Sequence, residues 1–241
     1  EQHEDQLLEI IRKSTFLNTE IEPVVKRGFV HKEIIETVEE LSIDLVVMGS
    51  KGTSSLEEYF IGTNVEKIIH TVIKRFGQLN YLINNASSYY PTYMGKLNEK
   101  DWNDLISSNL KAPLFLCQAA EKFLKEKKGS IINITDANES NPKKGYVIYN
   151  IAKSGLVSLT RSLAKDLSPD IRVNAVAPGA ILWPEDDQES EQGYRENLIS
   201  KTFLKKQGTP ENISKAVLFL LTTALYSTGE VIHVDGGGTH K

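Results

Sequence analysis

The stretch over residues 63–84 reads TNVEKIIHTVIKRFGQLNYLIN and joins a helix pattern to the start of a strand. It opens with a capping box, because Thr63 can accept a hydrogen bond at a helix N-terminus and Glu66 follows three residues later. Apolar residues then recur at helical spacing along one stripe, formed by Val65, Ile68, Ile69, Val72, Ile73 and Phe76. Gly77 ends the stripe, and a short apolar run follows at 79–84. The stretch therefore predicts an amphipathic helix that passes directly into a strand.

Segments with strand and helix patterns alternate on both sides of this stretch. The predicted strands cover roughly residues 21–26, 44–48, 79–84, 129–134, 171–176 and 230–234. The predicted helices cover roughly residues 4–16, 34–41, 63–76, 99–125, 148–166 and 210–223. The run at 44–48 is nearly all apolar, which is typical of a strand buried on both faces of a parallel sheet. We predict an α/β fold with a mostly parallel sheet, in a Rossmann-like or flavodoxin-like three-layer sandwich.

The composition narrows the functional classes. The 241 residues are 40% hydrophobic and 25% charged, which suits a globular chain with a sizeable core. A net charge of −4 gives no reason to expect nucleic acid or an anionic membrane as a partner. The single cysteine, Cys117, excludes an intramolecular disulfide and a cysteine-based zinc site, and the histidines show no metal-ligand spacing. The acidic start at 1–5 and the lack of a long apolar run predict a cytoplasmic protein without signal peptide or membrane span.

A series of motifs follows in order over residues 74–241. They are Asn84-Asn85-Ala86-Ser87 at the end of a strand, Asn109 in the next long helix, Asp136 after a strand, the Tyr-x-x-x-Lys pair Tyr149 and Lys153, the Pro178-Gly179 turn, and Val234-Asp235-Gly236-Gly237. In this order the motifs resemble those of the short-chain dehydrogenase/reductase family. The resemblance implies an oxidoreductase that uses NADP or NAD, with NADP favoured, on a small-molecule substrate.

The resemblance also implies a role for each matched residue. Tyr149 would be the proton donor, Lys153 its electrostatic tuner and the anchor of the nicotinamide ribose, and Asn109 part of a proton relay. The implied cofactor contacts are Asn85, Ala86, Tyr149, Lys153, Pro178 and Gly179. Residues four apart lie on one helix face, and an ammonium favours the phenolate of a tyrosine, whose ordinary pKa is about 10. Taken alone, such a pair is more often a surface pair of a helix.

Asp136 departs from the usual family pattern, which has a serine thirteen residues before the tyrosine. This departure resembles the pteridine reductase branch, where an aspartate and the tyrosine act together in protonating a reduced pterin. The implied substrate is pterin-like, with a carbonyl compound as the alternative. Asp136 could otherwise be an N-cap or turn residue. In the family, residues 183–206 would form a mobile substrate lid.

The N-terminal third does not carry the family's glycine turn for the cofactor pyrophosphate. Instead, Gly49, Gly52, Gly62 and Thr63 form Gly-x2-Gly-x9-Gly-Thr, and with residues 44–48 they resemble the C-terminal half of a universal stress protein. That family implies ATP at the 49–63 motif, and a glycine turn before a helix N-terminus is a physical anion site. The alternative is a turn that holds no ligand.

The chain thus resembles a hybrid of two α/β families, with residues 1–73 from one and 74–241 from the other. The apolar stripe of the 63–76 helix crosses the join in phase, so we predict one continuous sheet. The 43–49 strand would then lie beside the 79–84 strand, and its loop would replace the missing pyrophosphate loop. A thinly covered sheet face predicts a homo-oligomer. The favoured function is a reductase. The alternatives are an ATP-binding stress-type protein and a folded chimera without efficient activity.

Overall fold

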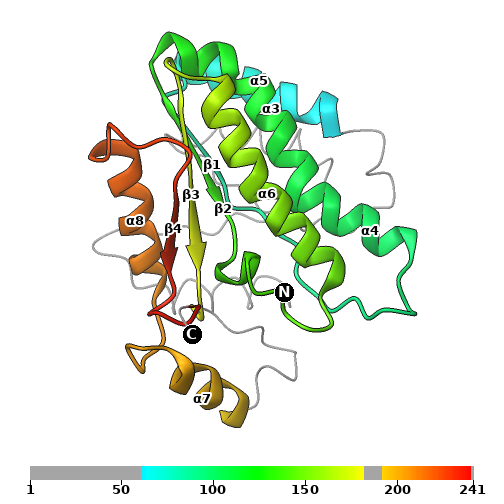
Figure 1. The fold of residues 1–241 in the computed structure, drawn as a ribbon. Coiled ribbons are helices and arrows are strands. Elements are labelled where there is room, and N and C mark those ends of the chain that lie inside the picture. The colour runs from blue at the N-terminus through cyan, green and yellow to red at the C-terminus, as the bar shows by residue number, and fades with distance from the viewer. Residues whose placement is uncertain (1–60, 182–191, 240–241) are drawn as a thin grey trace, which may run out of the picture. The chain divides into compact units, whose positions relative to one another are not determined.

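The computed structural model describes residues 61–181 and 192–239. All of these residues belong to one structural unit of the chain, Val47–Lys241. They form a parallel sheet with helices on both of its faces (Figure 1). No helix in the described ranges has the length and apolar character that a membrane span requires.

The sheet has the strand order β1-β2-β3-β4, and each neighbouring pair is parallel. The strands are β1 at Tyr81–Asn84, β2 at Ser130–Ile134, β3 at Arg172–Pro178 and β4 at Val231–Val234. The register places Ile83 opposite Ile132 and Ile132 opposite Asn174. Because all strands point the same way, their carboxyl ends meet at one edge, where open α/β sheets bind ligands. Asn85, Ala86, Asp136, Pro178 and Gly179 lie at or just beyond that edge, and Tyr149 lies in the first turn of a helix near it.

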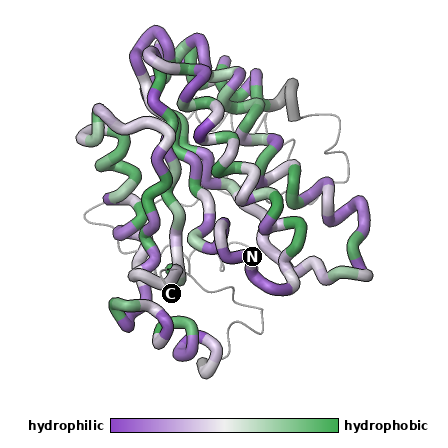
Figure 2. The backbone as a smooth tube through the Cα atoms, viewed as in Figure 1, coloured by the Kyte–Doolittle hydropathy of each residue, from purple (hydrophilic) through white to green (hydrophobic). Residues whose placement is uncertain are grey.

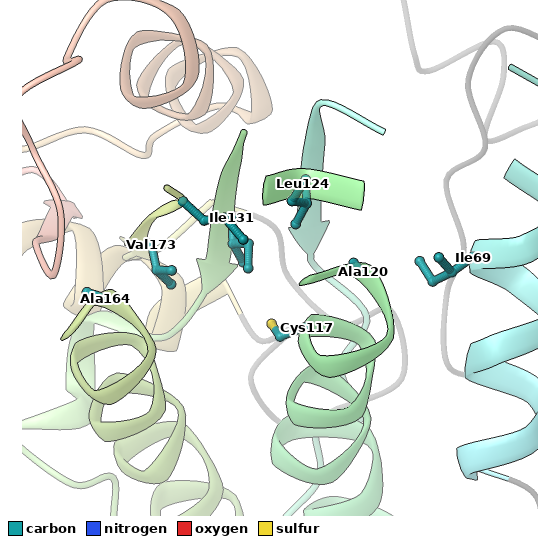
Figure 3. Packing of buried hydrophobic residues seen from close by; sticks show 8 residues of the cluster. Ile69, Cys117, Ala120, Leu124, Ile131, Ala164 and Val173 are labelled. Carbon is teal, nitrogen blue, oxygen red and sulfur yellow. The ribbon is translucent and has the colours of Figure 1, made fainter. Parts of the chain in front are cut away.

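One face of the sheet is covered by α3 (Ile61–Phe76), α5 (Ala112–Glu126) and α6 (Val147–Asp166). The buried core on this face joins the three helices to the strands through Ile69, Cys117, Ala120, Leu124, Ile131, Ala164, Ile171 and Val173 (Figure 3). Full burial of a single aliphatic side chain of this size stabilises a fold by about 1.5–3 kcal/mol. This cluster therefore fixes the helices that carry the candidate site.

The opposite face is covered by α8 (Pro210–Thr222), whose hydrophobic residues are visible as green segments in Figure 2. Its core cluster contains Ile132, Ile134, Val176, Val217, Leu220 and Leu221. Successive residues of a strand point to opposite faces, so β2 supplies Ile131 to one cluster and Ile132 to the other. The predicted three-layer α/β arrangement with a parallel sheet is confirmed for this unit.

Two of the predicted helices differ from the observed ones by more than one residue. The helix predicted to start with Thr63 as its cap begins at Ile61, so Thr63 lies in the first turn, a shift of the size common at helix ends. The helix predicted over 99–125 is divided into α4 (Glu99–Ile106), a π-helical turn η2 (Ser107–Lys111) and α5.

A further helix, α7 (Gln192–Lys201), lies in the segment 183–206, which we expected to be a mobile substrate lid. Its sequence places no apolar stripe along one side, so the hydrophobic pattern gives no signal for it.

The predictions for residues 1–60 lie outside the described residues. They include the four elements predicted before residue 50, Gly49 and Gly52 of the glycine motif, the position of the 43–49 strand, and the continuity of the sheet across the hybrid.

Candidate active site

Asp136 and Tyr149 are in direct contact. Asp136 follows the carboxyl end of β2, and Tyr149 lies in the first turn of α6. The Tyr149 hydroxyl donates a hydrogen bond to Oδ2 of Asp136 at 2.8 Å. The other carboxylate oxygen accepts the backbone N–H of Asn138 at 2.7 Å and thereby caps a short 3-10 helix, η3 (Ala137–Glu139). Asp136 is thus both an N-cap, one of its two predicted roles, and a hydrogen-bond acceptor for Tyr149.

Lys153 lies one turn after Tyr149 on the same side of α6. Its side chain is almost fully buried, with 3% exposure, and its Nζ donates to the carbonyl oxygen of Ile134 at 3.0 Å. Burial lowers the pKa of Lys153 from 10.5 to about 8, although the negative charge of Asp136 opposes part of this shift. At neutral pH the side chain is therefore an ammonium, held between the end of β2 and the tyrosine.

The pKa of Tyr149 is shifted opposite to our expectation. Burial, and then the charge and hydrogen bond of Asp136, raise the pKa of Tyr149 well above 10. The Lys153 ammonium lies 5.7 Å from the centroid of the tyrosine ring, whereas the carboxylate contacts the hydroxyl itself. The nearer anion outweighs the cation, so the expected lowering of this pKa by Lys153 is wrong. Tyr149 is a neutral phenol at the pH of most cells.

Asn109 lies in the π-helical turn η2, and its side chain is 1% exposed. Its Nδ2 donates to the carbonyl oxygens of Ser88 and Leu105, each at 2.9 Å. Its Oδ1 accepts the hydroxyl of Ser87 at 2.6 Å. A single π-helical turn inside a longer helix is frequently found at functional sites. These bonds attach the helix to the segment that follows β1.

Two of the residues predicted to contact the cofactor, Asn85 and Ala86, follow β1 directly. At the same edge of the sheet, Pro178 ends β3 and Gly179 follows it. The N–H of Gly179 donates to the carbonyl oxygen of Val234 at 3.1 Å. A Cβ atom on Gly179 would lie only 2.6 Å from the Cα of Asp235, so a glycine is required for this close approach.

Only two of the four residues of the glycine motif lie within the described residues. Gly62 and Thr63 lie in the first turn of α3, and their side chains are outside the described ones. Gly49 and Gly52 lie outside the described residues altogether.

A cluster of tyrosines beside Tyr149 was not predicted. The Tyr89 ring stacks on Tyr146 and meets Tyr149 edge-on, with 4.8 Å between centroids in each pair. The Lys143 ammonium donates to the Tyr89 hydroxyl at 2.7 Å and lies 4.3 Å from the Tyr146 centroid. The only signal in the sequence was the density of tyrosines before Pro91 and around Tyr149, because aromatic contacts between distant segments leave no periodic pattern.

Ser87 belongs to the Asn84-Asn85-Ala86-Ser87 motif, but its hydrogen bond to Asn109 was likewise not predicted.

Within the described part of the chain, no group of three or more His, Cys, Asp or Glu residues is arranged to hold a metal ion.

Two family models match the chain. The model described as enoyl-(acyl carrier protein) reductase matches residues 62–239, and that of the universal stress protein family matches residues 1–73. The matches overlap in the first turns of α3, where the sequence placed the join of the hybrid. The predicted hybrid of these two families is therefore confirmed at the level of family matches.

The similar proteins match the part of the chain that holds the candidate site. The 3-oxoacyl-(acyl-carrier-protein) reductase FabG of Thermotoga maritima is 32% identical over 176 residues, covering 72% of this chain and 71% of that protein. FabG of Staphylococcus aureus is 35% identical over 177 residues, with the same coverage.

Solved structures of similar proteins also match about three quarters of the chain. An apo SCOR enzyme from Clostridium thermocellum has a TM-score of 0.65 and 33% identity, over 75% of this chain and 70% of that chain. A short-chain dehydrogenase/reductase from Brucella melitensis, titled glucose/ribitol dehydrogenase, has a TM-score of 0.68 and 31% identity, over 73% of this chain and 71% of that chain.

Proposed function

Because the chain belongs to the short-chain dehydrogenase/reductase family of oxidoreductases, we propose that it is an NAD(P)H-dependent reductase of a pterin-like substrate. The observation that carries this proposal is the 2.8 Å hydrogen bond from the Tyr149 hydroxyl to the Asp136 carboxylate. A carboxylate accepts hydrogen bonds from N–H groups, which a pterin ring presents, and it carries a charge that a serine hydroxyl lacks. NADPH is the favoured donor.

Reduction of a C=N or C=O bond adds a hydride to the carbon and a proton to the heteroatom. A bound nicotinamide cofactor supplies the hydride. Tyr149 supplies the proton, since its raised pKa keeps the hydroxyl protonated until the heteroatom becomes basic. A substrate N–H that donates to Asp136 takes the place of the tyrosine hydroxyl at that oxygen and lets the hydroxyl turn toward the substrate. Lys153 then stabilises the phenolate that remains.

The residues present fit the nicotinamide half of the cofactor. Lys153 is buried, has three N–H groups and gives one of them to Ile134, so two more can serve ribose hydroxyls. Pro178 and Gly179 lie at the same edge of the sheet, beside the place where the nicotinamide would lie. Asn85 and Ala86 would also contact the cofactor, and we propose that its pyrophosphate binds at the 49–63 motif.

The runner-up function is ATP binding by the stress-protein segment, which the family match over residues 1–73 favours. A third possibility is a folded chimera without efficient activity. Parallel calorimetric titrations with NADPH and with ATP separate the three. We expect NADPH binding; binding of ATP alone supports the runner-up, and binding of neither by a cooperatively melting protein supports the chimera.

The substrate is tested by comparing a dihydropterin with a 3-oxoacyl thioester, the substrate class named for the FabG relatives. We expect faster NADPH oxidation with the dihydropterin. Asp136→Ser should lower this rate by about 100-fold, because it removes a charge-assisted acceptor, while thioester reduction changes less. A wild-type protein that prefers the thioester contradicts the pterin assignment and leaves a carbonyl reductase.

We also propose a homo-oligomer. Leu218 and Phe219 of α8 and Leu225 and Tyr226 after it are exposed apolar or aromatic residues on adjoining positions of the chain. An apolar surface of this kind favours association. Sedimentation at several protein concentrations tests it, and a monomer throughout would contradict it.

A further inference from the structure

Helix α6 begins at Val147 without a cap of its own. Its N-cap residue, Tyr146, makes no side-chain hydrogen bond to the helix. The first N–H groups of a helix have no partner inside it and need acceptors from elsewhere. Tyr149 lies in this first turn, so whatever holds these N–H groups also holds the tyrosine.

Thr92, from a loop 56 positions earlier in the chain, supplies that acceptor. Its hydroxyl oxygen accepts the N–H of Ile148 at 3.1 Å, and Ile148 is the second residue of the helix. This is the bond that a serine or threonine cap normally makes within its own helix. Thr92 is 3% exposed and Ile148 2%, so water cannot easily replace the hydroxyl.

The backbone of the same residue holds the chain just before the helix. The N–H of Thr92 donates to the carbonyl oxygen of Gly145 at 2.6 Å, and its carbonyl oxygen accepts the N–H of Val147 at 3.5 Å. These bonds form an isolated parallel bridge between Thr92 and Tyr146. Thr92 therefore binds on both sides of the N-cap position, from Gly145 to Ile148.

The loop that carries Thr92 approaches Tyr149 in a second way. Tyr89 of this loop packs its ring edge-on against Tyr149. Tyr93 covers Gly145, whose φ is +85° and where a Cβ would lie 2.7 Å from the Tyr93 ring. The loop and the start of α6 therefore contact each other through side chains as well as through backbone hydrogen bonds.

We propose that Thr92 is a positioning residue for Tyr149: by capping α6 from the loop after β1, it sets the place of the tyrosine hydroxyl opposite Asp136. This rests on the proposed function, in which Tyr149 is the proton donor. Thr92 does not touch the reacting atoms and acts through the backbone of Ile148, the residue next to Tyr149.

The test uses three variants of the full chain. Thr92→Val keeps the shape of the side chain and removes the hydroxyl, whereas Thr92→Ser keeps the hydroxyl. Thr160→Val is the matched control, because Thr160 is also a buried threonine of the α6 region whose hydroxyl donates to Leu156 at 2.8 Å and accepts from Asn133 at 2.9 Å. Loss of that hydroxyl perturbs the core without touching the start of the helix.

Turnover is the first measurement. Thr92→Val should lower kcat for the reductase by about 10- to 100-fold through misplacement of the donor, while KM for NADPH stays within about twofold. Thr92→Ser should restore kcat to within about threefold of wild type. Thr160→Val should lower the melting temperature without this loss of kcat.

Two measurements need no turnover and separate this inference from the proposed function. The amide hydrogen of Ile148 should exchange with solvent about tenfold faster in Thr92→Val than in wild type, as expected for loss of one capping bond, and not in Thr160→Val. The Tyr149 signal in a tyrosine ring 13C spectrum should shift in Thr92→Val alone. If wild type binds NADPH but reduces nothing, the proposed function fails and these two signals still decide the role of Thr92. Unchanged exchange at Ile148, or equal kcat in the two valine variants, overturns the assignment.

Discussion

Strands β1 and β2 run in the same direction and pair residue for residue, yet they are covered to different extents. All five residues of β2 are buried, whereas Tyr81 and Ile83 of β1 are each 45% exposed. The difference arises on the α8 face, where the core cluster takes its strand residues from β2, β3 and β4. The described sheet is therefore packed on both faces at β2 and β3 and less completely at β1.

The two predicted halves of the site follow this division. Asp136 comes after β2, and Tyr149 and Lys153 lie in α6, which packs on the covered part of the sheet. The predicted cofactor contacts Asn85 and Ala86 come after β1. In the proposed function, the proton-transfer residues therefore lie on the more fully covered side of the unit, and two of the predicted cofactor contacts, Asn85 and Ala86, lie on the less covered side. Four experiments test this difference between the two sides.

The largest effect is expected from Tyr149→Phe on the covered side. Removal of the proton donor should lower kcat by about 10²- to 10⁴-fold, the usual contribution of a general acid. The melting temperature should change little, since the ring keeps its contact with Tyr89 and Asp136 keeps the N–H of Asn138. Steady-state kinetics and calorimetric melting measure the two quantities. A variant that keeps a tenth of the activity would mean that another group donates the proton.

The next experiment compares a matched pair of isoleucines. Ile132 and Ile83 are register partners in neighbouring strands, but Ile132 is fully buried and Ile83 is 45% exposed. Ile132→Ala should lower the free energy of unfolding by about 2–5 kcal/mol, the range for truncation of a buried aliphatic residue. Ile83→Ala should lower the free energy of unfolding by about 1 kcal/mol or less, because the half-exposed Ile83 side chain buries less apolar area on folding. Urea unfolding gives both values, and equal losses would show that β1 is as well covered as β2.

Features that depend on local burial could be predicted from the sequence, and features that depend on distant contacts could not. The strands and the long helices were predicted because burial on one or both faces leaves a period in the sequence, as it does for Val65 to Phe76. The contact of Asp136 with Tyr149 was expected from a family pattern thirteen residues apart. What escaped prediction depends on contacts between distant segments, such as the cap that Thr92 places on Ile148.

The π-helical turn at Asn109 and the shifted pKa values escaped for the same reason. The side chain of Asn109 binds Ser88 across twenty-one positions of the chain, and no local propensity encodes that bond. The pKa of Tyr149 is raised by burial and by Asp136, quantities that exist only once the chain is folded. The candidate site residues could be named from the sequence, but the direction of the pKa shift of Tyr149 could not be predicted from it.

A smaller effect is expected from pH, and it acts in opposite directions on activity and stability. Burial lowers the pKa of Lys153 to about 8, so raising the pH through 8 removes the ammonium and should lower kcat. The unfolded chain still binds this proton up to its ordinary pKa near 10.5, so between about 8 and 10.5 it holds more protons than the folded chain. The contribution of Lys153 to the free energy of unfolding should therefore rise with pH in that window.

Activity profiles and urea unfolding of wild type and Lys153→Met, compared from pH 7 to 10, test this. The free energy of unfolding of wild type minus that of Lys153→Met should rise between about pH 8 and pH 10. A kcat that stays level through pH 9 would show that the ammonium is not required.

The smallest effect should come from Ser87→Ala, at the point where the β1 side meets the reacting groups. Ser87 follows β1 and donates to Oδ1 of Asn109 at 2.6 Å, while Nδ2 of Asn109 keeps its bonds to Ser88 and Leu105. Because Asn109 stays anchored by its other end, the loss is one hydrogen bond of about 1 kcal/mol, or about fivefold. If the β1 side serves the cofactor, this loss should appear in KM for NADPH more than in kcat. A fivefold fall in kcat at constant KM would instead place Ser87 with Tyr149 and Lys153 on the proton-transfer side, and the boundary between the two halves of the site would move from β2 to β1.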